Sequence, residues 1–341
     1  MAAGADNRQQ TTDDSHDRRQ KGFHPVTTMR FGLQTSLNNV EWREVEDIWT
    51  FLDRETKFHS AWTFDHFIPP GPGQDPNANC FEGWSALAAL AARTSRIRLG
   101  CLVTGVTYRE PAVLAKMAAT IDHLSGGRLE FGIGAAWHQG EHQMYGMRFP
   151  PAKEREDRLE EAVRLIRMLF DSEGPVDFEG LYYRLRRAVF LPKPVQRPHP
   201  PIMVGGGGER RTLRTLARYG DVMNVSGTPE MVRRKIEVLE RHCRETGRDP
   251  AEIGKTTFGA IVVSENQGLI DRVAAMSAAG AGLSPEEAKR QLPIGSAAHV
   301  RDIVERYAEV GVTQMIMMSQ GPWKRAVYER INAEVVEPFA G

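Results

Sequence analysis

The stretch "PIMVGGGGERRTLRTLARYGDVMNVSG" (201–227) contains the repeating unit from which the fold can be inferred. A short apolar run (201–206) leads into four glycines, then into a helical pattern that ends at Gly220, and a second apolar run (221–227) follows. Nearly continuous apolar runs are typical of strands that are buried on both faces of a parallel sheet. The stretch therefore predicts a strand, a crossover helix and a parallel strand.

The same unit recurs along the whole chain after the first 28 residues. Eight apolar runs, each followed by a helical segment, lie at 29–35, 60–67, 96–106, 128–136, 201–206, 221–227, 255–265 and 314–320. Eight such repeats over this length predict a closed (β/α)₈ barrel spanning 29–341. A doubly wound open sheet is the alternative, because the repeat alone does not show closure.

Two segments depart from the repeat. Residues 171–200 alternate like a hairpin and end in a proline-rich connector, so we expect an insertion between the fourth helix and the fifth strand, over the barrel mouth. Residues 1–28 are polar and charged without an apolar stretch, which predicts a disordered leader or a misplaced start.

Composition narrows the class of function. The 44 basic and 44 acidic residues balance to zero net charge, which argues against nucleic-acid or membrane-surface partners. The 3 cysteines are widely spaced without a CxxC pair, and no apolar run is long enough to cross a bilayer. We therefore expect a cytoplasmic protein that acts on a small molecule.

The glycines at 205–208 lie between the fifth strand and its helix, at the end of the barrel where active sites form. Glycines there let a phosphate approach the backbone amides, and Arg210, Arg211 and Thr212 are near enough in sequence to assist. The alternative is a flexible turn with solvated arginines.

Histidines mark two other strand ends. His66, beside Asp65, follows the second strand and is a candidate for proton exchange or ring contact; the alternative is a structural histidine. His138 and His142 are four residues apart, a spacing that fits zinc, but no third ligand is near, so we predict no metal. Contact of His138 and Glu141 with a ring or substrate is the tentative interpretation.

The segments "FDHF" (64–67), "LVTGVTYREPAVLAKMAATIDHLSGGRLEFGIGAAW" (102–137) and "PKPVQRPHPPIMVGGGGERRTLRTLARYGDVMN" (192–224) together resemble the bacterial luciferase-like superfamily, and within it the branch that depends on coenzyme F-420. The resemblance implies a luciferase-type barrel that is often dimeric, with His66 near the reactive carbon of the deazaflavin. It also implies a non-prolyl cis peptide at the end of the third strand, which we place between Gly105 and Val106. The cofactor contacts it implies are Asp65, Thr104, Gly105, Val106, Ala136, Trp137, Gly205, Gly206, Gly207, Gly208, Arg210, Arg211 and Thr212.

One departure from the family pattern bears on the substrate. Trp137 stands where the sugar-phosphate dehydrogenases of the family carry a glutamate, which argues against a sugar-phosphate substrate. The resemblance implies hydride transfer between F-420 and a small organic substrate. An oxygen-using monooxygenase with reduced FMN is the second hypothesis, and a non-catalytic cofactor-binding protein is the third.

Overall fold

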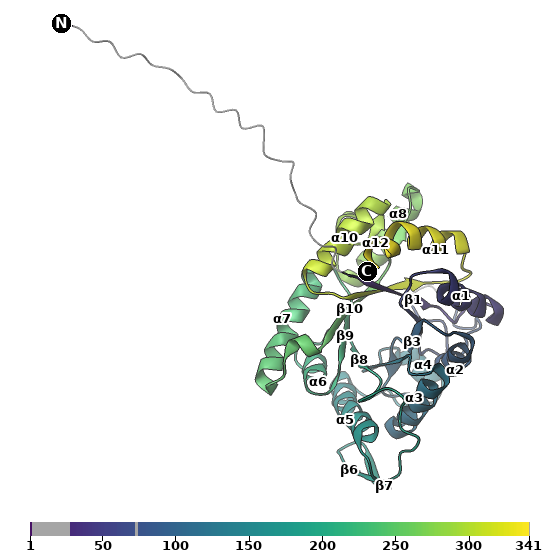
Figure 1. Cartoon of the computed structure of the whole chain (residues 1–341), viewed down its shortest axis with the longest axis vertical. Coiled ribbons are helices and arrows are strands. Elements are labelled where there is room, and N and C mark those ends of the chain that lie inside the picture. Colours follow the sequence, from purple (N-terminus) through teal and green to yellow (C-terminus); the bar gives the residue numbers. More distant parts are fainter. Residues whose placement is uncertain (2–27, 72–73, 341) are drawn as a thin grey trace.

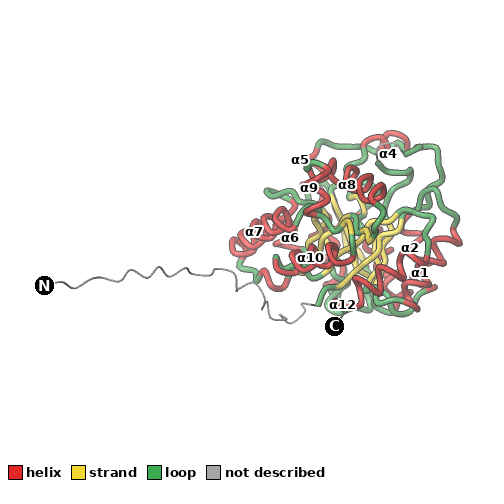
Figure 2. The backbone as a smooth tube through the Cα atoms, turned by 90° about the horizontal axis from the view of Figure 1, so that it is seen from above, coloured by secondary structure: helices red, strands yellow, loops and turns green. Residues whose placement is uncertain are grey.

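Eight parallel strands form the centre of the molecule, and helices surround them (Figures 1 and 2). The computed structural model describes residues 1, 28–71 and 74–340, so nearly all of the expected leader lies outside the described residues. The barrel strands are β1 (Arg30–Thr35), β2 (Ser60–Thr63), β3 (Arg98–Cys101), β5 (Leu129–Gly134), β8 (Ile202–Gly205), β9 (Val222–Val225), β10 (Gly254–Gly259) and β13 (Gln314–Ser319).

Pairing between β3 and β5 closes the ring. Leu99 lies opposite Leu129 and Gly100 opposite Glu130, and every other neighbouring pair of barrel strands is also parallel. This confirms the closed barrel and excludes the open sheet. The two-residue strand β4 (Thr104–Gly105) continues the third unit and pairs with β5 outside the ring.

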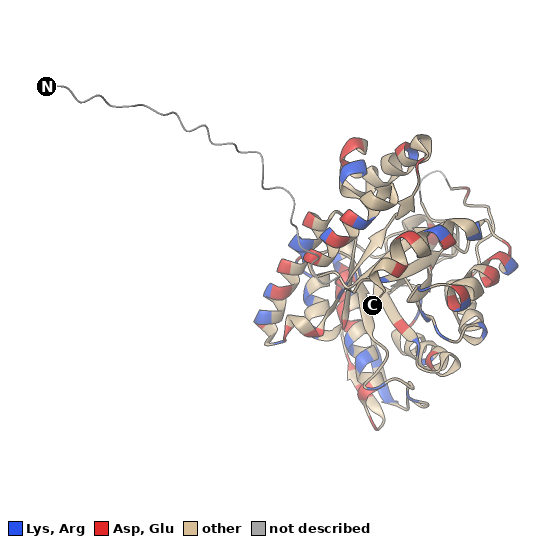
Figure 3. Ribbon diagram, turned by 45° about the horizontal axis from the view of Figure 1, so that its top comes forward, with Lys and Arg blue, Asp and Glu red and all other residues tan. Residues whose placement is uncertain are grey.

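The outer layer consists of α1 (Trp42–Glu55), α2 (Gly83–Arg93), α3 (Pro111–Ser125), α5 (Ala152–Asp171), α6 (Thr212–Tyr219), α7 (Pro229–Thr246), α10 (Ala297–Glu309) and α11 (Arg325–Ile331). Acidic and basic side chains are both distributed over the outer helices (Figure 3). Within the described residues, no helix has both the length and the apolar character needed to cross a membrane.

The seventh unit is larger than the sequence predicts. The helical segment ending near residue 291 is not the outer helix of that unit, because its helices α8 (Gln267–Ala281) and α9 (Pro285–Gln291) pack on each other around a small separate apolar cluster. Two short strands, β11 (Val262–Val263) and β12 (Ile294–Gly295), pair at its base, and the outer position belongs to α10. The remaining short elements are α4 (Gln139–Met144), η1 (Pro250–Glu252), η2 (Asn332–Val336) and α12 (Glu337–Phe339).

The insertion before β8 is a hairpin, as predicted, but its position differs. Strands β6 (Val176–Glu179) and β7 (Arg184–Ala188) pair antiparallel, and the turn between them is held by α5, where the Glu161 carboxylate accepts the amides of Leu181 and Tyr182. The hairpin therefore lies on the outer side of the helix layer (Figure 1) rather than over the barrel mouth. A sequence pattern reveals a hairpin but not the helix face on which it packs.

Trp62 fills the interior of the barrel. Its side chain is fully buried, and its indole nitrogen donates to Ser60 Oγ at 2.8 Å. Glycines on the two neighbouring strands provide the space for the ring, because a Cβ on Gly100 would lie 2.5 Å from Trp62 Cζ3 and one on Gly32 would lie 2.9 Å from its Nε1. Glycines on β1 and β3, the two strands beside β2, therefore allow the Trp62 ring to fit inside the barrel.

Replacing Gly100 by alanine tests this packing. The new methyl group would also lie 2.4 Å from the Glu130 carbonyl oxygen, so relief requires backbone movement, and we expect the free energy of unfolding to fall by about 3 kcal/mol. Urea unfolding followed by circular dichroism measures the change. Gly259→Ala is the matched control, because a Cβ there meets no atom within 4 Å and should change stability by less than about 1 kcal/mol. Equal stability of the two variants would contradict the interior packing.

Candidate active site

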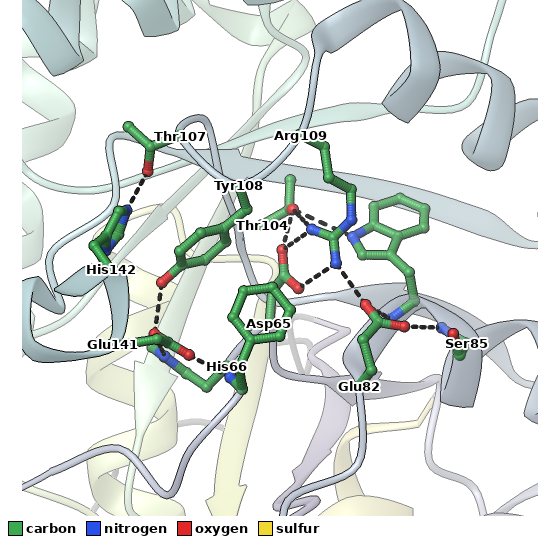
Figure 4. A network of polar contacts seen from close by, with 12 residues as sticks. Asp65, His66, Glu82, Ser85, Thr104, Thr107, Tyr108, Arg109, Glu141 and His142 are labelled. Atoms are coloured by element: carbon green, nitrogen blue, oxygen red, sulfur yellow. Dashed lines mark hydrogen bonds and ion pairs between the residues drawn. The ribbon is translucent and has the colours of Figure 1, made fainter. Parts of the chain in front are cut away.

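A buried ion pair fixes the carboxyl end of β2. Asp65 receives two hydrogen bonds from the Arg109 guanidinium, Nη1 to Oδ2 at 2.7 Å and Nη2 to Oδ1 at 3.0 Å (Figure 4). The Thr104 hydroxyl also donates to Asp65, and Arg109 reaches Glu82, which caps the start of α2. Burial lowers the pKa of Arg109, but the two carboxylates outweigh it and raise that pKa above its usual value. Burial raises the pKa of Asp65, against the lowering effect of Arg109 and Thr104. The pair joins three elements, the end of β2, the chain beyond β4 and the start of α2.

His66 follows Asp65 and is oriented by a buried carboxylate (Figure 4). Its Nδ1 lies 3.0 Å from Oε2 of Glu141, and its side chain is only 13% exposed. The Tyr108 hydroxyl donates to the same oxygen at 2.7 Å, and the amide of Phe67 donates to the other oxygen. Glu141 is completely buried. It therefore positions His66 and Tyr108 and is not among the lining residues of the cavities beside His66, so contact of Glu141 with a substrate stays a prediction.

The protonation of this group follows from its hydrogen bonds. Burial raises the pKa of Glu141, but the hydrogen bonds from His66, Phe67 and Tyr108 outweigh burial and hold that pKa below its usual value. Burial and the nearby carboxylate raise the pKa of Tyr108, so the phenol remains a donor. Because ionised Glu141 only accepts hydrogen bonds, Nδ1 of His66 carries the proton. Its Nε2 is left to act as donor or acceptor elsewhere.

A non-prolyl cis peptide follows the third strand, but it lies between Leu102 and Val103. The prediction of a cis bond between Gly105 and Val106 is wrong. Gly105 lies in the ladder opposite Gly134, and the Val106 amide donates to the Gly134 carbonyl at 2.9 Å. The irregular segment is instead the interval between β3 and β4, where pairing is interrupted.

A cavity of about 570 Å³ runs from His66 to the glycines after β8. Its wall brings together the predicted catalytic residue His66 and most of the residues predicted to bind a cofactor: Asp65, Thr104, Gly105, Ala136, Trp137, Gly205, Gly206, Gly207, Gly208 and Thr212. Val106, Arg210 and Arg211 are not among its lining residues. Val106 is buried, Arg210 is exposed, and Arg211 pairs with Asp157 on α5.

The four glycines have different roles. Gly205 belongs to β8, and a Cβ there would lie 2.8 Å from Cγ2 of Val103. Gly206 has a φ of 122°, a conformation open to glycine and strained for other residues. A Cβ on Gly208 would lie 2.6 Å from the Thr212 hydroxyl oxygen. The run therefore makes room for Val103 at one end and exposes backbone beside Thr212 at the other, where an anion could approach.

The glycine end of this cavity carries two charged residues that the sequence analysis missed. Lys235 of α7 lies beside Gly207, and its Nζ pairs with Oε1 of Glu209 at 2.8 Å. Glu156 of α5 lies beside Gly208, and its Oε1 accepts from the Thr212 hydroxyl at 3.3 Å. Both come from outer helices distant in sequence, so no local motif marks them. Asn224 and Ser226, which also line the cavity, stand at the end of β9 and were detectable by position.

His138 and His142 make hydrogen bonds around the start of α4, and contact of His138 with a ring or substrate stays a prediction. Nδ1 of His138 accepts the amide of Glu141 at 3.0 Å at the start of α4. His142 is fully buried between the Thr107 hydroxyl, 2.6 Å from its Nε2, and the His138 carbonyl. Across residues 28–71 and 74–340, no group of three or more metal-binding side chains is arranged to hold an ion.

A second cavity of about 260 Å³ adjoins the first at the ends of β1, β2 and β13. His66, Trp137, Leu102 and Phe258 line both cavities. The polar residues special to the second cavity are neutral: Gln34, Ser36, Asn38, Ser319 and Gln320. His66 thus stands on the boundary between a long cavity with a charged end and a small cavity with a neutral lining.

Substituting Glu141 by glutamine tests its ionisation. We expect a loss of about 3 kcal/mol in unfolding free energy at pH 7, because a buried charged partner is removed. Since the folded pKa lies below the ordinary value of 4.5, this contribution is complete above that pH and is lost as pH falls through the folded pKa. The difference between wild type and E141Q in urea unfolding should therefore shrink below about pH 4.5. A difference independent of pH down to 3 would show that Glu141 is not ionised.

Comparison with known proteins agrees with this geometry. The luciferase-like monooxygenase family profile matches residues 23–290. An F420-dependent glucose-6-phosphate dehydrogenase of Kineococcus radiotolerans is 32% identical over 309 residues, which cover 83% of this chain and 89% of that protein. Two solved structures share the fold at 22% identity, each aligned over 92% of this chain and 100% of the other: an F420-dependent secondary alcohol dehydrogenase with an F420–acetone adduct (TM-score 0.78) and the monooxygenase RslO1 of Streptomyces bottropensis (TM-score 0.73). The chain belongs to the luciferase-like monooxygenase family.

Proposed function

We propose that this protein is an oxidoreductase that transfers hydride between coenzyme F-420 and a small, uncharged alcohol or carbonyl compound. The observation that carries the proposal is the position of His66, oriented by a buried carboxylate at the boundary of two cavities. The relative of Kineococcus radiotolerans, which is described as F420-dependent, supports the choice of cofactor.

The long cavity fits such a cofactor. At its glycine end, backbone groups beside Thr212 and Lys235 are accessible to a phosphate. Any residue larger than glycine at position 208 would fill this space, because a Cβ there would lie against Thr212 and Glu156. Its other end, between Val103, Ala136 and Trp137, would hold the flat ring. When bound, the deazaflavin supplies a carbon that donates or accepts hydride.

His66 supplies the proton step. In the direction of alcohol oxidation, unprotonated Nε2 takes the hydroxyl proton while the adjacent carbon loses hydride. In the reverse direction, protonated Nε2 returns a proton to the carbonyl oxygen. Glu141 acts only by holding Nδ1–H, which fixes the tautomer and steadies the positive charge on the ring when Nε2 is protonated. One histidine therefore serves both directions.

The small cavity favours an uncharged substrate. Among its described lining residues there is no lysine or arginine, the side chains that proteins use to bind phosphate groups. Its neutral amides and hydroxyls can hydrogen-bond to alcohols and carbonyls, and Phe64, Leu102 and Phe258 provide an apolar surface. This proposal departs from the sugar-phosphate substrate named for the 32% identical relative.

A monooxygenase that uses reduced FMN is the second candidate, favoured by the match to the luciferase-like monooxygenase family profile. Oxygen consumption in the presence of reduced FMN separates the two. Uptake of oxygen coupled to product formation would replace the hydride-transfer proposal.

Replacing His66 by alanine should lower kcat by about 10²- to 10⁴-fold, because the proton acceptor is removed. The dissociation constant for F-420, measured by fluorescence, should change by less than about threefold, since contacts along the rest of the cavity remain. The exposed histidine His123 provides the control, as His123→Ala removes an imidazole far from the cavity. Full turnover of H66A at saturating substrate would overturn the assigned role.

Substrate charge is tested by comparing a secondary alcohol such as cyclohexanol with glucose 6-phosphate. We expect F-420 reduction with the alcohol and kcat/KM at least about 10²-fold lower with the sugar phosphate, because the described residues that line the small cavity include no lysine or arginine to compensate the desolvation of the phosphate. Absorbance of oxidised F-420 follows the reaction. Preferential use of the sugar phosphate would contradict the uncharged-substrate proposal and leave the cofactor assignment intact.

A further inference from the structure

We propose that Glu156 makes the glycine end of the long cavity select a phosphodiester, with one negative charge, over a phosphate monoester, with two. This inference rests on the proposed use of F-420, whose phosphate is a diester, whereas the phosphate of FMN is a monoester. Glu156 would thus be a specificity-determining residue that separates two related cofactors.

Glu156 faces the place where a phosphate would lie. It projects from the first turns of α5, lines the cavity and is 26% exposed. Its Oε1 accepts the Thr212 hydroxyl at 3.3 Å and would lie 3.1 Å from a Cβ placed on Gly208. The carboxylate therefore lies directly beside the Gly208 backbone, where the missing side chain leaves space. It also accepts the hydrogen bond of the Thr212 hydroxyl, which an incoming phosphate would otherwise accept.

Carboxylates lie against the nearby positive charges. Lys235 and Arg234 both pair with Glu209, at 2.8 and 3.2 Å. Arg211 pairs with Asp157 and lies 3.9 Å from Glu156 Oε2. Lys235 and Glu156 are the charged residues that line this end of the cavity in the described chain. The lining charges therefore cancel, in contrast to the arginine-rich sites that proteins commonly use for doubly charged phosphates.

The charge on the phosphate group then decides how strongly Glu156 opposes binding. A phosphodiester carries one negative charge near neutral pH, whereas a monoester loses its second proton near pH 6 and carries about two charges above it. Repulsion by the Glu156 carboxylate is proportional to the charge on the phosphate group that lies beside it, so Glu156 opposes a monoester about twice as strongly in free energy as a diester at the same place. Affinity depends exponentially on free energy, so a doubled repulsion squares the fold-change in affinity. The fold-change that Glu156 causes in FMN affinity should therefore be about the square of the fold-change that it causes in F-420 affinity.

The test is a fluorescence titration of wild type and Glu156→Gln with F-420, FMN and riboflavin at pH 8. Glutamine keeps the size and can still hydrogen-bond to Thr212, but it removes the charge. We expect E156Q to bind FMN about tenfold more tightly and F-420 about threefold more tightly, while riboflavin, which has no phosphate, is unchanged.

Glu160→Gln is the matched control, because Glu160 lies one turn further along α5 and pairs with Arg214 and Arg218 rather than lining the cavity. It changes net charge equally and should leave all three affinities within about twofold. An equal gain for FMN, F-420 and riboflavin, or no gain in E156Q, would overturn the role of Glu156. Failure of F-420 to bind wild type would instead overturn the proposed cofactor, so the two failures are distinguishable.

Discussion

The buried ion pair between Asp65 and Arg109 is the constraint on which the active-site end of the barrel depends. It joins the end of β2 to the chain beyond β4, and through Glu82 it reaches the start of α2. Removing one partner of such a pair leaves an uncompensated buried charge, which typically costs about 3–5 kcal/mol. The pair therefore restricts alternative positions of these elements. Because His66 is the next residue after Asp65, the anchor that fixes the strand end also fixes the backbone of the proposed catalytic histidine.

Small residues and one aliphatic side chain determine the shape of the cavity in the adjacent strands. Val103 occupies space that is left free by glycines on β5 and β8, since a Cβ on Gly134 or Gly205 would lie within 2.9 Å of its methyl carbons. The glycines of these strands thus serve packing as well as access to the backbone. This explains why a glycine run in the sequence is an ambiguous sign of phosphate binding: its first member is required by Val103, and only the later members face the open end beside Thr212.

The sequence was sufficient to predict the barrel because each of its eight strands is a compact apolar run followed by a helical segment, and both signals are local. It was insufficient for α10 and for the position of the β6–β7 hairpin, which depend on which surface each element packs against. The residues of the functional site also divide into those that local sequence reveals and those that depend on tertiary contacts. His66 and the glycines stand at strand ends and were predicted, whereas Glu141, 75 residues from His66, was identified without its role. Lys235 and Glu156 were missed because their importance comes from tertiary contact alone.

The distribution of proton-exchanging groups constrains the chemistry further. Asp65 is occupied by Arg109, the pKa of Tyr108 is raised, and Glu156 and Lys235 stand at the glycine end of the long cavity. Among the described residues that border the small cavity, His66 is therefore the group placed to accept and return a proton. Interconversion of an alcohol and a carbonyl moves one hydride and one proton, and the carbon centre needs no second acid or base. A single oriented histidine beside a neutral cavity matches that requirement. A reaction that must protonate two separate atoms of its substrate would need a second group, and the described residues that line the small cavity do not offer one.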